Sequence, residues 1–169
     1  QALAIDVEGR LIVGDGGNSR TLFFSKTTTR PDALIITDSG QRIGDDILNA
    51  TAALQKVSLK SSARKTFHHL GIGNDGTDTE PFRLKGSRSA AKFKLSYHKG
   101  SGANVTANLL TGLYQTDAIG VGEETDFEIR LAVKKKKKKA NATVYLTAES
   151  LLDGEIDRVQ TTTRYKPKR

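Results

Sequence analysis

The chain has 169 residues, 36% of them apolar, which fits one domain with an extension and is enough to bury a core. It has no cysteine, which excludes disulfide frameworks, thiolate nucleophiles and zinc–thiolate sites, and its sequence has no apolar run of membrane-spanning length. The formal net charge of +8 favours anionic partners, but the lysine run at 134–139 alone contributes six of these charges.

Residues 1–29 form a predicted N-terminal extension with strand character. Its alternating apolar positions are Leu3, Ile5, Val7, Leu11 and Val13. A glycine-rich break over residues 14–18 follows, and Leu22 and Phe24 indicate another short strand. The pattern predicts either one extended arm that donates a strand to a neighbouring molecule or a hairpin that is added to its own domain.

Residues 30–169 form a predicted β-sandwich domain. Short strand signals recur between turns rich in glycine, asparagine and aspartate, and no long helical pattern interrupts them. These signals lie at residues 34–36, 57–59, 70–72, 82–84, 93–97, 105–110 and 159–165. The fold class that follows is all-β, an immunoglobulin-like antiparallel sandwich with a strand-like extension.

The clearest strand signals flank the lysine run. Apolar residues alternate with other residues over 127–133 and again over 144–148, which is typical of strands with one buried face. Because the connection between them is short and charged, we expect the two strands to pair as an antiparallel hairpin.

Several short motifs resemble a family of secreted bacterial immunoglobulin-like domains of unassigned function. The matching residues are Arg30-Pro31-Asp32-Ala33-Leu34-Ile35, Asn74-Asp75-Gly76-Thr77, Asn104-Val105-Thr106, Gly112, Tyr114, Thr116, Gly122 and Asp157-Arg158-Val159. Val121 stands where that family has a proline. The resemblance covers about residues 30–163 and implies a cell-surface or extracellular sandwich without catalytic residues.

Candidate sites for metals and phosphates are weak. His68 and His69 are adjacent, so they point to opposite faces of a strand, and His98 lies far away in sequence. Oxygen ligands for calcium occur together at Asn74, Asp75, Asp78 and Glu80, but the spacing of an EF-hand is missing and the pattern favours a plain hydrogen-bonded turn. The glycine-rich stretches lack the ending of a phosphate-binding loop. We therefore predict a protein that is not an enzyme and needs no cofactor.

The lysine run is the candidate polyanion site. It consists of Lys134, Lys135, Lys136, Lys137, Lys138 and Lys139, and a basic tail follows at Arg164, Lys166, Lys168 and Arg169. No aromatic residues alternate with the lysines, which argues against specific nucleic-acid binding. The other interpretation is a solvated loop whose charge discourages aggregation. In both cases the charge is expected to belong to one loop and a tail and not to a distributed basic face.

Two features of the sequence predict that the protein is exported. The sequence starts at Gln1 and contains no methionine, which predicts an exported chain whose signal peptide has been removed. Acceptor motifs for glycosylation occur at Asn49, Asn104 and Asn141. We expect an extracellular or cell-surface location.

These observations lead to three functional hypotheses. The first is a structural subunit of a surface fibre or pilus-like filament, in which copies of the chain assemble by β-strand addition through the N-terminal arm. The second is a secreted monomeric module that binds acidic polysaccharides or other polyanions. The third is a jelly-roll capsid or phage structural protein, which would show the same strand pattern.

Overall fold

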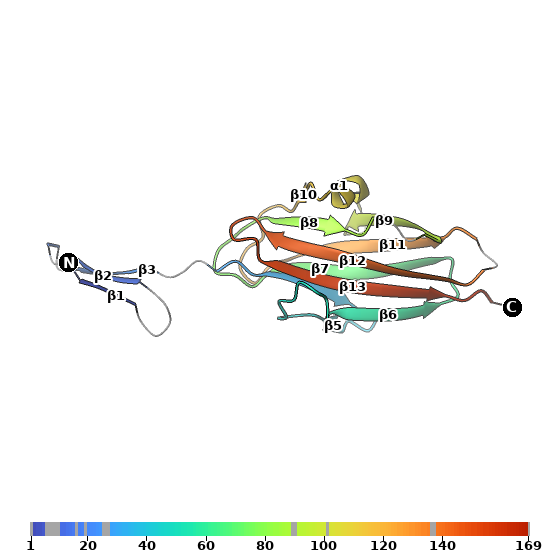
Figure 1. The fold of residues 1–169 in the computed structure, drawn as a ribbon, viewed down its shortest axis with the longest axis horizontal. Helices are drawn as coiled ribbons and strands as arrows, with labels where there is room; N and C mark the ends of the chain where they lie inside the picture. The colour runs from blue at the N-terminus through green and yellow to red at the C-terminus, as the bar shows by residue number, and fades with distance from the viewer. Residues whose placement is uncertain are drawn as a thin grey trace.

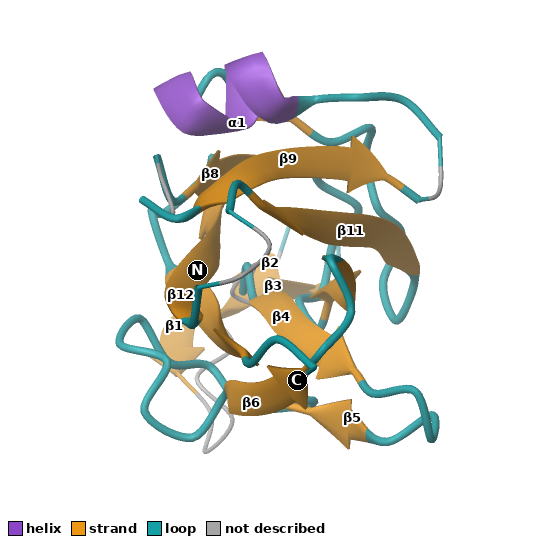
Figure 2. Ribbon diagram, turned by 90° about the vertical axis from the view of Figure 1, so that its right-hand side faces the viewer, coloured by secondary structure: helices purple, strands orange, loops and turns teal. Residues whose placement is uncertain are grey.

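A computed structural model gives the fold of the chain. It describes residues 2–5, 11–15, 17–18, 20–24, 28–88, 91–100, 102–135 and 138–168. These residues form strands in three sheets and one short helix, so the all-β prediction is confirmed (Figures 1 and 2). Among them, no helix has the length and apolar character of a membrane span.

The N-terminal extension forms a small antiparallel sheet of its own. Its strands are β1 (Ala2–Ile5), β2 (Leu11–Asp15) and β3 (Arg20–Phe24), in the order β1-β2-β3. Figure 1 shows this sheet beyond one end of the sandwich. Of the two predicted arrangements, the structure therefore contains a hairpin with a third strand. Val7 lies outside the described residues.

Two five-stranded sheets face each other in the sandwich. One has the order β5-β4-β7-β11-β9 and the other β10-β8-β12-β13-β6. The strands of the first sheet are β4 (Pro31–Ile36), β5 (Arg42–Ile43), β7 (Lys65–Asn74), β9 (Phe93–Lys99) and β11 (Glu124–Val133). Those of the second are β6 (Lys56–Ser61), β8 (Phe82–Gly86), β10 (Tyr114–Gln115), β12 (Ala140–Ser150) and β13 (Ile156–Tyr165).

The strand order is that of an immunoglobulin-like sandwich. If β4 and β6 are two halves of the first strand, β4-β7-β11-β9 is the ABED sheet and β8-β12-β13 is the CFG sheet. The second half, β6, has crossed to the CFG sheet and pairs there with β13. This pairing is parallel, unlike all the other strand pairs among the described residues. The final strand of the sandwich is supplied by the chain itself.

The predicted hairpin around the lysines is wrong in its pairing. β11 pairs with β7 and β9, whereas β12 pairs with β8 and β13, so the lysine loop crosses from one sheet to the other. The alternation itself is correct, since Phe127, Ile129, Val144 and Leu146 are buried. Period-two alternation defines a buried face but contains no information about the partner strand.

One predicted strand region is helical instead. α1 spans Thr106–Thr111 and buries Leu109 completely. It ends at Gly112, whose φ of 73° is left-handed and therefore suits a glycine. The helix covers β8 and β9 at one edge of the sandwich (Figure 2).

The turn after β7 holds the segment that leads from the extension into the sandwich. The backbone N–H of Thr77 donates to the carbonyl of Thr28 (2.9 Å), and that of Asp75 donates to Arg30 (2.9 Å). A Cβ at Gly76 would lie 2.5 Å from the oxygen of Thr28 and 3.1 Å from the nitrogen of Arg30. The turn therefore needs glycine here because two backbones approach closely.

Gly76→Ala should loosen this junction. The added methyl group displaces the backbone of Thr28, at a cost of about 1–3 kcal/mol of stability. The amide hydrogens of Asp75 and Thr77 should then exchange faster, because their hydrogen bonds to the carbonyls of Arg30 and Thr28 are weakened. Gly102→Ala is the matched control, because its Cβ would meet only the oxygen of Lys99, at 3.6 Å. Unchanged exchange in Gly76→Ala would contradict the assigned role.

Candidate functional site

Cations from four separate segments gather at the end of the sandwich opposite the N-terminal sheet (Figure 1). We call the following residues the basic end: Lys60, Lys92, Lys134, Lys135, Lys138, Lys139, Arg164, Lys166 and Lys168. All of them are exposed. Lys136 and Lys137 lie outside the described residues. The structure thus corrects the expectation of an isolated loop and tail, because it brings both together with two further lysines.

Strand direction explains why these segments meet. β6 and β13 run parallel, with Lys60 beside Arg164 in the register, and both strands end here. β11 also ends here, and β12 begins here. Two backbone hydrogen bonds secure the connecting segments: Lys134 donates to the carbonyl of Lys92 (3.0 Å), and Lys166 donates to that of Ser61 (2.9 Å).

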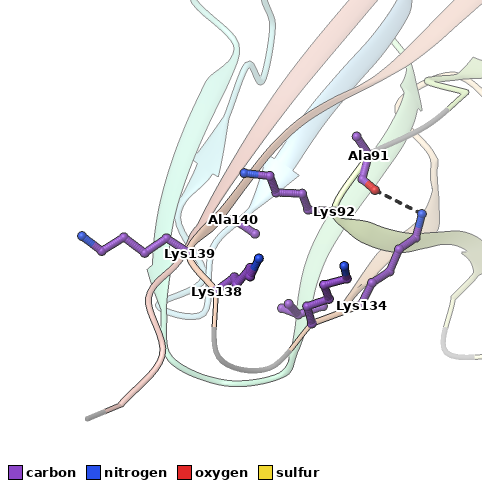
Figure 3. Close-up of a pocket in the computed structure, with 8 residues that line it drawn as sticks. Ala91, Lys92, Lys134, Lys138, Lys139 and Ala140 are labelled. Atoms are coloured by element: carbon purple, nitrogen blue, oxygen red, sulfur yellow. Dashed lines mark hydrogen bonds between the residues drawn. The ribbon is translucent and has the colours of Figure 1, made fainter.

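Three adjoining hollows run across the basic end. The first has a volume of about 440 Å³ and lies between the lysine loop and the segment before β9 (Figure 3). The second, of about 450 Å³, shares Lys92 and Lys139 with the first and reaches Arg164. The third, of about 320 Å³, shares Lys60 and Lys166 with the second. Together they form a trough that suits an extended ligand better than a compact one.

The trough combines positive charge with neutral polar groups. Ser61, Ser62 and Asn141 line it between the lysines, and the described lining of the three hollows includes no carboxylate. Tyr165 is its aromatic residue, but this side chain is only 5% exposed. The described lining therefore offers charge and hydrogen bonds but no exposed ring on which a base could stack.

Charge is distributed unevenly along the chain. Segments 59–66, 91–95, 131–141 and 162–168 contain 14 Lys and Arg residues and no Asp or Glu. The rest of the chain has 13 basic and 19 acidic residues, a net charge of −6. The modest total of +8 conceals this separation, which makes the basic end a strong local source of positive potential.

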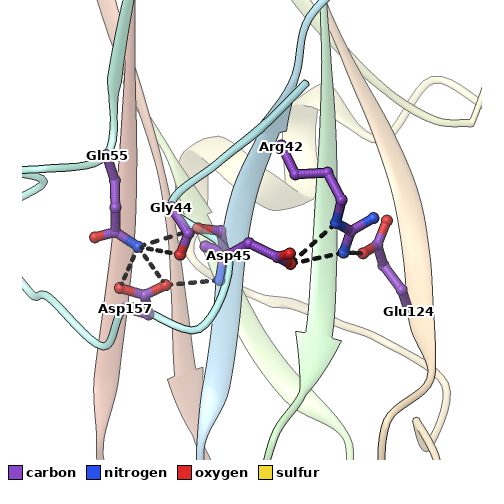
Figure 4. A network of polar contacts seen from close by, with 7 residues as sticks. Arg42, Gly44, Asp45, Gln55, Glu124 and Asp157 are labelled. Carbon is purple, nitrogen blue, oxygen red and sulfur yellow. Dashed lines mark hydrogen bonds and ion pairs between the residues drawn. The ribbon is translucent and has the colours of Figure 1, made fainter. Parts of the chain in front are cut away.

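A buried carboxylate connects the two sheets away from the basic end. Asp157 on β13 accepts hydrogen bonds from the backbone N–H groups of Ala33 (2.6 Å) and Asn49 (2.7 Å) and from the amide of Gln55 (2.9 Å) (Figure 4). The same amide donates to the carbonyl oxygens of Ala33 (3.1 Å) and Ile47 (2.7 Å). Asp157 and Gln55 are fully buried, so the network fixes the start of β4 and the crossing segment against β13.

Further carboxylates surround this network. Burial raises the pKa of Asp32 to about 7, and the charges of Asp75, Asp157 and Asp45 raise it too. Desolvation likewise raises the pKa of Asp75. Arg42 lies nearby at the surface and contacts Asp45 (2.9 Å) and Glu124 (2.5 Å) (Figure 4).

The proposed calcium ligands do not converge. The amide of Asn74 donates to the carbonyls of Asp78 and Ile119, and its oxygen accepts from Gly76. The carboxylate of Asp78 accepts from Thr77, and that of Glu80 turns inward to Ser150. Among the described residues, no group of His, Asp or Glu side chains has the geometry of a metal site. In the described structure these side chains thus take part in hydrogen bonds that hold the turn and its neighbours.

The three histidines have separate environments. His68 is buried and contacts the hydroxyl of Thr163 at 2.7 Å, and burial lowers its pKa to about 4. His69 points outward, and its Nδ1 lies 3.8 Å from a carboxylate oxygen of Glu128. His98 contacts the carbonyl of Gly102 and the hydroxyl of Ser96.

The predicted contact arm exposes its apolar side chains. Leu3 is 71% exposed, Ile5 74% and Leu11 39%, whereas Val13 is half-buried. The register places Leu3 beside Val13 and Ile5 beside Leu11, so these four side chains share one face of the small sheet.

The three glycosylation candidates differ in accessibility. Asn49 is half-buried, and its oxygen accepts hydrogen bonds from the N–H and hydroxyl of Thr51. Asn104 is exposed and accepts from the N–H of Thr106. Asn141 is exposed and lines the trough, so a glycan attached there would occupy part of the basic end.

Sequence reasoning missed Lys60 and Lys92 as members of the basic end. Both are single lysines in ordinary strand surroundings, and no local signal distinguishes them from Lys56 or Lys85. Only the strand order places them beside the lysine loop.

Comparison with protein-family models gives no match, and comparison with curated proteins gives none either. Among solved structures, a family 123 glycoside hydrolase from Clostridium perfringens is 8% identical with a TM-score of 0.48, and the match covers 83% of this chain and 28% of the hydrolase. The Vibrio cholerae protease VesB is 8% identical with a TM-score of 0.41, over 92% of this chain and 41% of the protease. The pilin subunit CooA from enterotoxigenic Escherichia coli is 14% identical with a TM-score of 0.41, over 82% and 99%. Similarity this low carries no functional information.

Asp32→Asn should flatten the pH dependence of stability. The pKa of Asp32 rises from 3.8 to about 7 on folding, so its contribution to stability is complete below pH 3.8 and is lost as the pH rises through 7. Between pH 4 and 7.5 the thermal midpoint of Asp32→Asn should fall less than that of the unmodified chain. Asp38→Asn, at an exposed position, is the control. Equal slopes for Asp32→Asn and the unmodified chain would contradict the role of Asp32.

Proposed function

We propose that this protein is a non-enzymatic extracellular β-sandwich module that binds acidic polysaccharides through its basic end. One observation carries the proposal: nine exposed cations from four segments line three adjoining hollows, and their described lining contains no carboxylate. Such a cluster repels itself, and an anionic polymer relieves that repulsion while it releases condensed counterions.

The chemistry of the trough favours a glycan over a nucleic acid. Eight of the nine cations are lysines, which act as compact point charges, whereas base or phosphate recognition in fixed geometry favours arginine. Ser61, Ser62 and Asn141 offer hydrogen bonds to sugar hydroxyl groups, and the lining has no exposed ring for stacking. Sulfate and carboxylate groups along a sugar chain match this pattern.

Self-assembly into a fibre is the second candidate function. The specific observation in its favour is the small sheet with exposed Leu3 and Ile5 at the end of the molecule opposite the C-terminus (Figure 1). Opposed ends suit a head-to-tail contact, which propagates instead of closing. The sandwich needs no final strand from a neighbouring molecule, because its own last strand, β13, pairs with β12 along its whole length.

Lys60→Ser/Lys166→Ser should weaken binding of heparin, used as a model sulfated glycan, by roughly tenfold, and should lower the salt slope by about two. Isothermal titration calorimetry at several salt concentrations measures both. Lys56→Ser/Lys85→Ser removes the same charge from exposed positions outside the trough and should leave affinity nearly unchanged.

Two outcomes would overturn the glycan proposal. Equal losses in the two double variants would show that only net charge matters. Tighter binding of a DNA duplex than of heparin at the same salt concentration would favour a nucleic-acid partner.

A further inference from the structure

Strand β7 has a partner on both sides over only part of its length. β11 pairs with residues 65–73, whereas β4 pairs only with residues 69–74. β4 ends at Ile36, and the chain turns back into β5 beside β4 before it crosses to the opposite sheet and forms β6. Within the described part of the chain, residues 65–68 therefore have no partner strand on the side that β4 leaves, and we call this segment the open β7 edge.

The open β7 edge presents unsatisfied backbone groups. The N–H of Val133 donates to the carbonyl of Arg64 (3.0 Å), in the same register that pairs Lys65 with Ala132. Residues of an antiparallel strand direct their N–H and C=O groups alternately to either side. The backbone N–H and C=O groups of Arg64, Thr66 and His68 thus point toward β11. Those of Lys65 and Phe67 point toward the open side, so each of these two residues offers one donor and one acceptor there.

A hollow of about 330 Å³ lies beside this edge. Ile36, Val57, Leu59 and Phe67 contribute its apolar lining. Phe67 is 44% exposed, which is unusual for a large apolar side chain in a central strand. An unpaired edge next to apolar pockets is the arrangement that accepts an added strand.

The N-terminal sheet carries a matching edge strand. Among the described residues β1 pairs only with β2, so its outer edge has no partner strand there. It has four residues, as many as the open β7 edge, and it alternates small with large side chains. Leu3 and Ile5 are its exposed large residues.

We propose that β1 of one copy adds in antiparallel orientation to the open β7 edge of a second copy. The inference rests on the second proposed function, self-assembly, and is independent of glycan binding. In this orientation the C-terminal end of β1, at Ile5, lies beside Lys65, where the open β7 edge begins.

In this contact, copies assemble although each sandwich is already complete. β1 stays in its own sheet and joins the two sheets edge to edge, with Leu3 or Ile5 directed to the hollow beside Phe67. Donor and acceptor lie on different elements, so the contact is heterologous and each copy keeps one of each. Because four residues bury little area, we expect a weak interface, of the class below about 1,200 Å².

The test separates donor, acceptor and fold. Leu3→Glu/Ile5→Glu removes the donor at exposed positions. Phe67→Pro removes a backbone N–H on the open edge without removing a hydrogen bond to β11. Phe67→Ala is its matched control, because it removes the same ring but keeps the N–H.

In sedimentation velocity up to about 1 mM, each defective variant should associate at least about tenfold more weakly than the unmodified chain. Phe67→Pro should also associate more weakly than Phe67→Ala. An equimolar mixture of the donor and Phe67→Pro variants should form dimers and nothing longer.

Amide hydrogen exchange of the unmodified chain provides a readout that does not depend on a variant folding. The N–H groups of Lys65 and Phe67 should become protected as protein concentration rises, while that of the exposed Lys56 should not. If the chain stays monomeric at about 1 mM, both self-assembly and this inference are wrong. If it assembles while Phe67→Pro matches Phe67→Ala and Lys65 stays unprotected, only the β7 acceptor is wrong. Heparin affinity should be unchanged in every variant of this set.

Discussion

The sandwich depends on one buried carboxylate at the place where the first strand changes sheets. Asp157 accepts hydrogen bonds from Ala33, Asn49 and Gln55, and thereby joins β13 to both ends of the crossing segment. Burying a carboxylate is costly unless donors surround it, and here backbone and amide groups satisfy it. Losing any one of these donors would leave the buried carboxylate with fewer hydrogen bonds, so the crossing and the carboxylate stabilise each other.

The crossing has two consequences at opposite sides of the fold. It places β6 beside β13, which brings Lys60 next to Arg164 and completes the trough of the basic end. It also removes β4 from the side of β7, which leaves residues 65–68 with a single partner strand. The proposed glycan site and the proposed acceptor edge are therefore products of the same topological feature, although their chemistry is different. Anion binding uses side-chain charge, whereas strand addition uses backbone groups and apolar pockets.

Charge separation fits this division of roles. Every acidic residue lies outside the segments that form the end with the lysine loop. Repulsion between these lysines destabilises the fold only slightly while they remain solvated and screened by salt. The same charges attract a polymer of opposite charge that covers them. At the other end, burial raises the pKa of Asp32, and the charge of Asp75 raises it further, while burial also raises the pKa of Asp75. The junction to the N-terminal sheet is thus the more pH-sensitive part of the molecule.

Alternating apolar residues determined the all-β class, the buried faces of strands such as β12, and the loop position of the lysines, because one-sided burial imposes a period of two. The turn at Asn74–Thr77 was also evident from its composition, although its role in holding Thr28 and Arg30 was not. Pairing was decided only by the tertiary structure: alternation suggested that β11 and β12 form a hairpin, and they lie in different sheets. The same holds for Lys60, Lys92 and the open β7 edge. A local pattern states which face of a strand is buried, but partners, gathered charges and open edges arise from contacts between residues far apart in the chain.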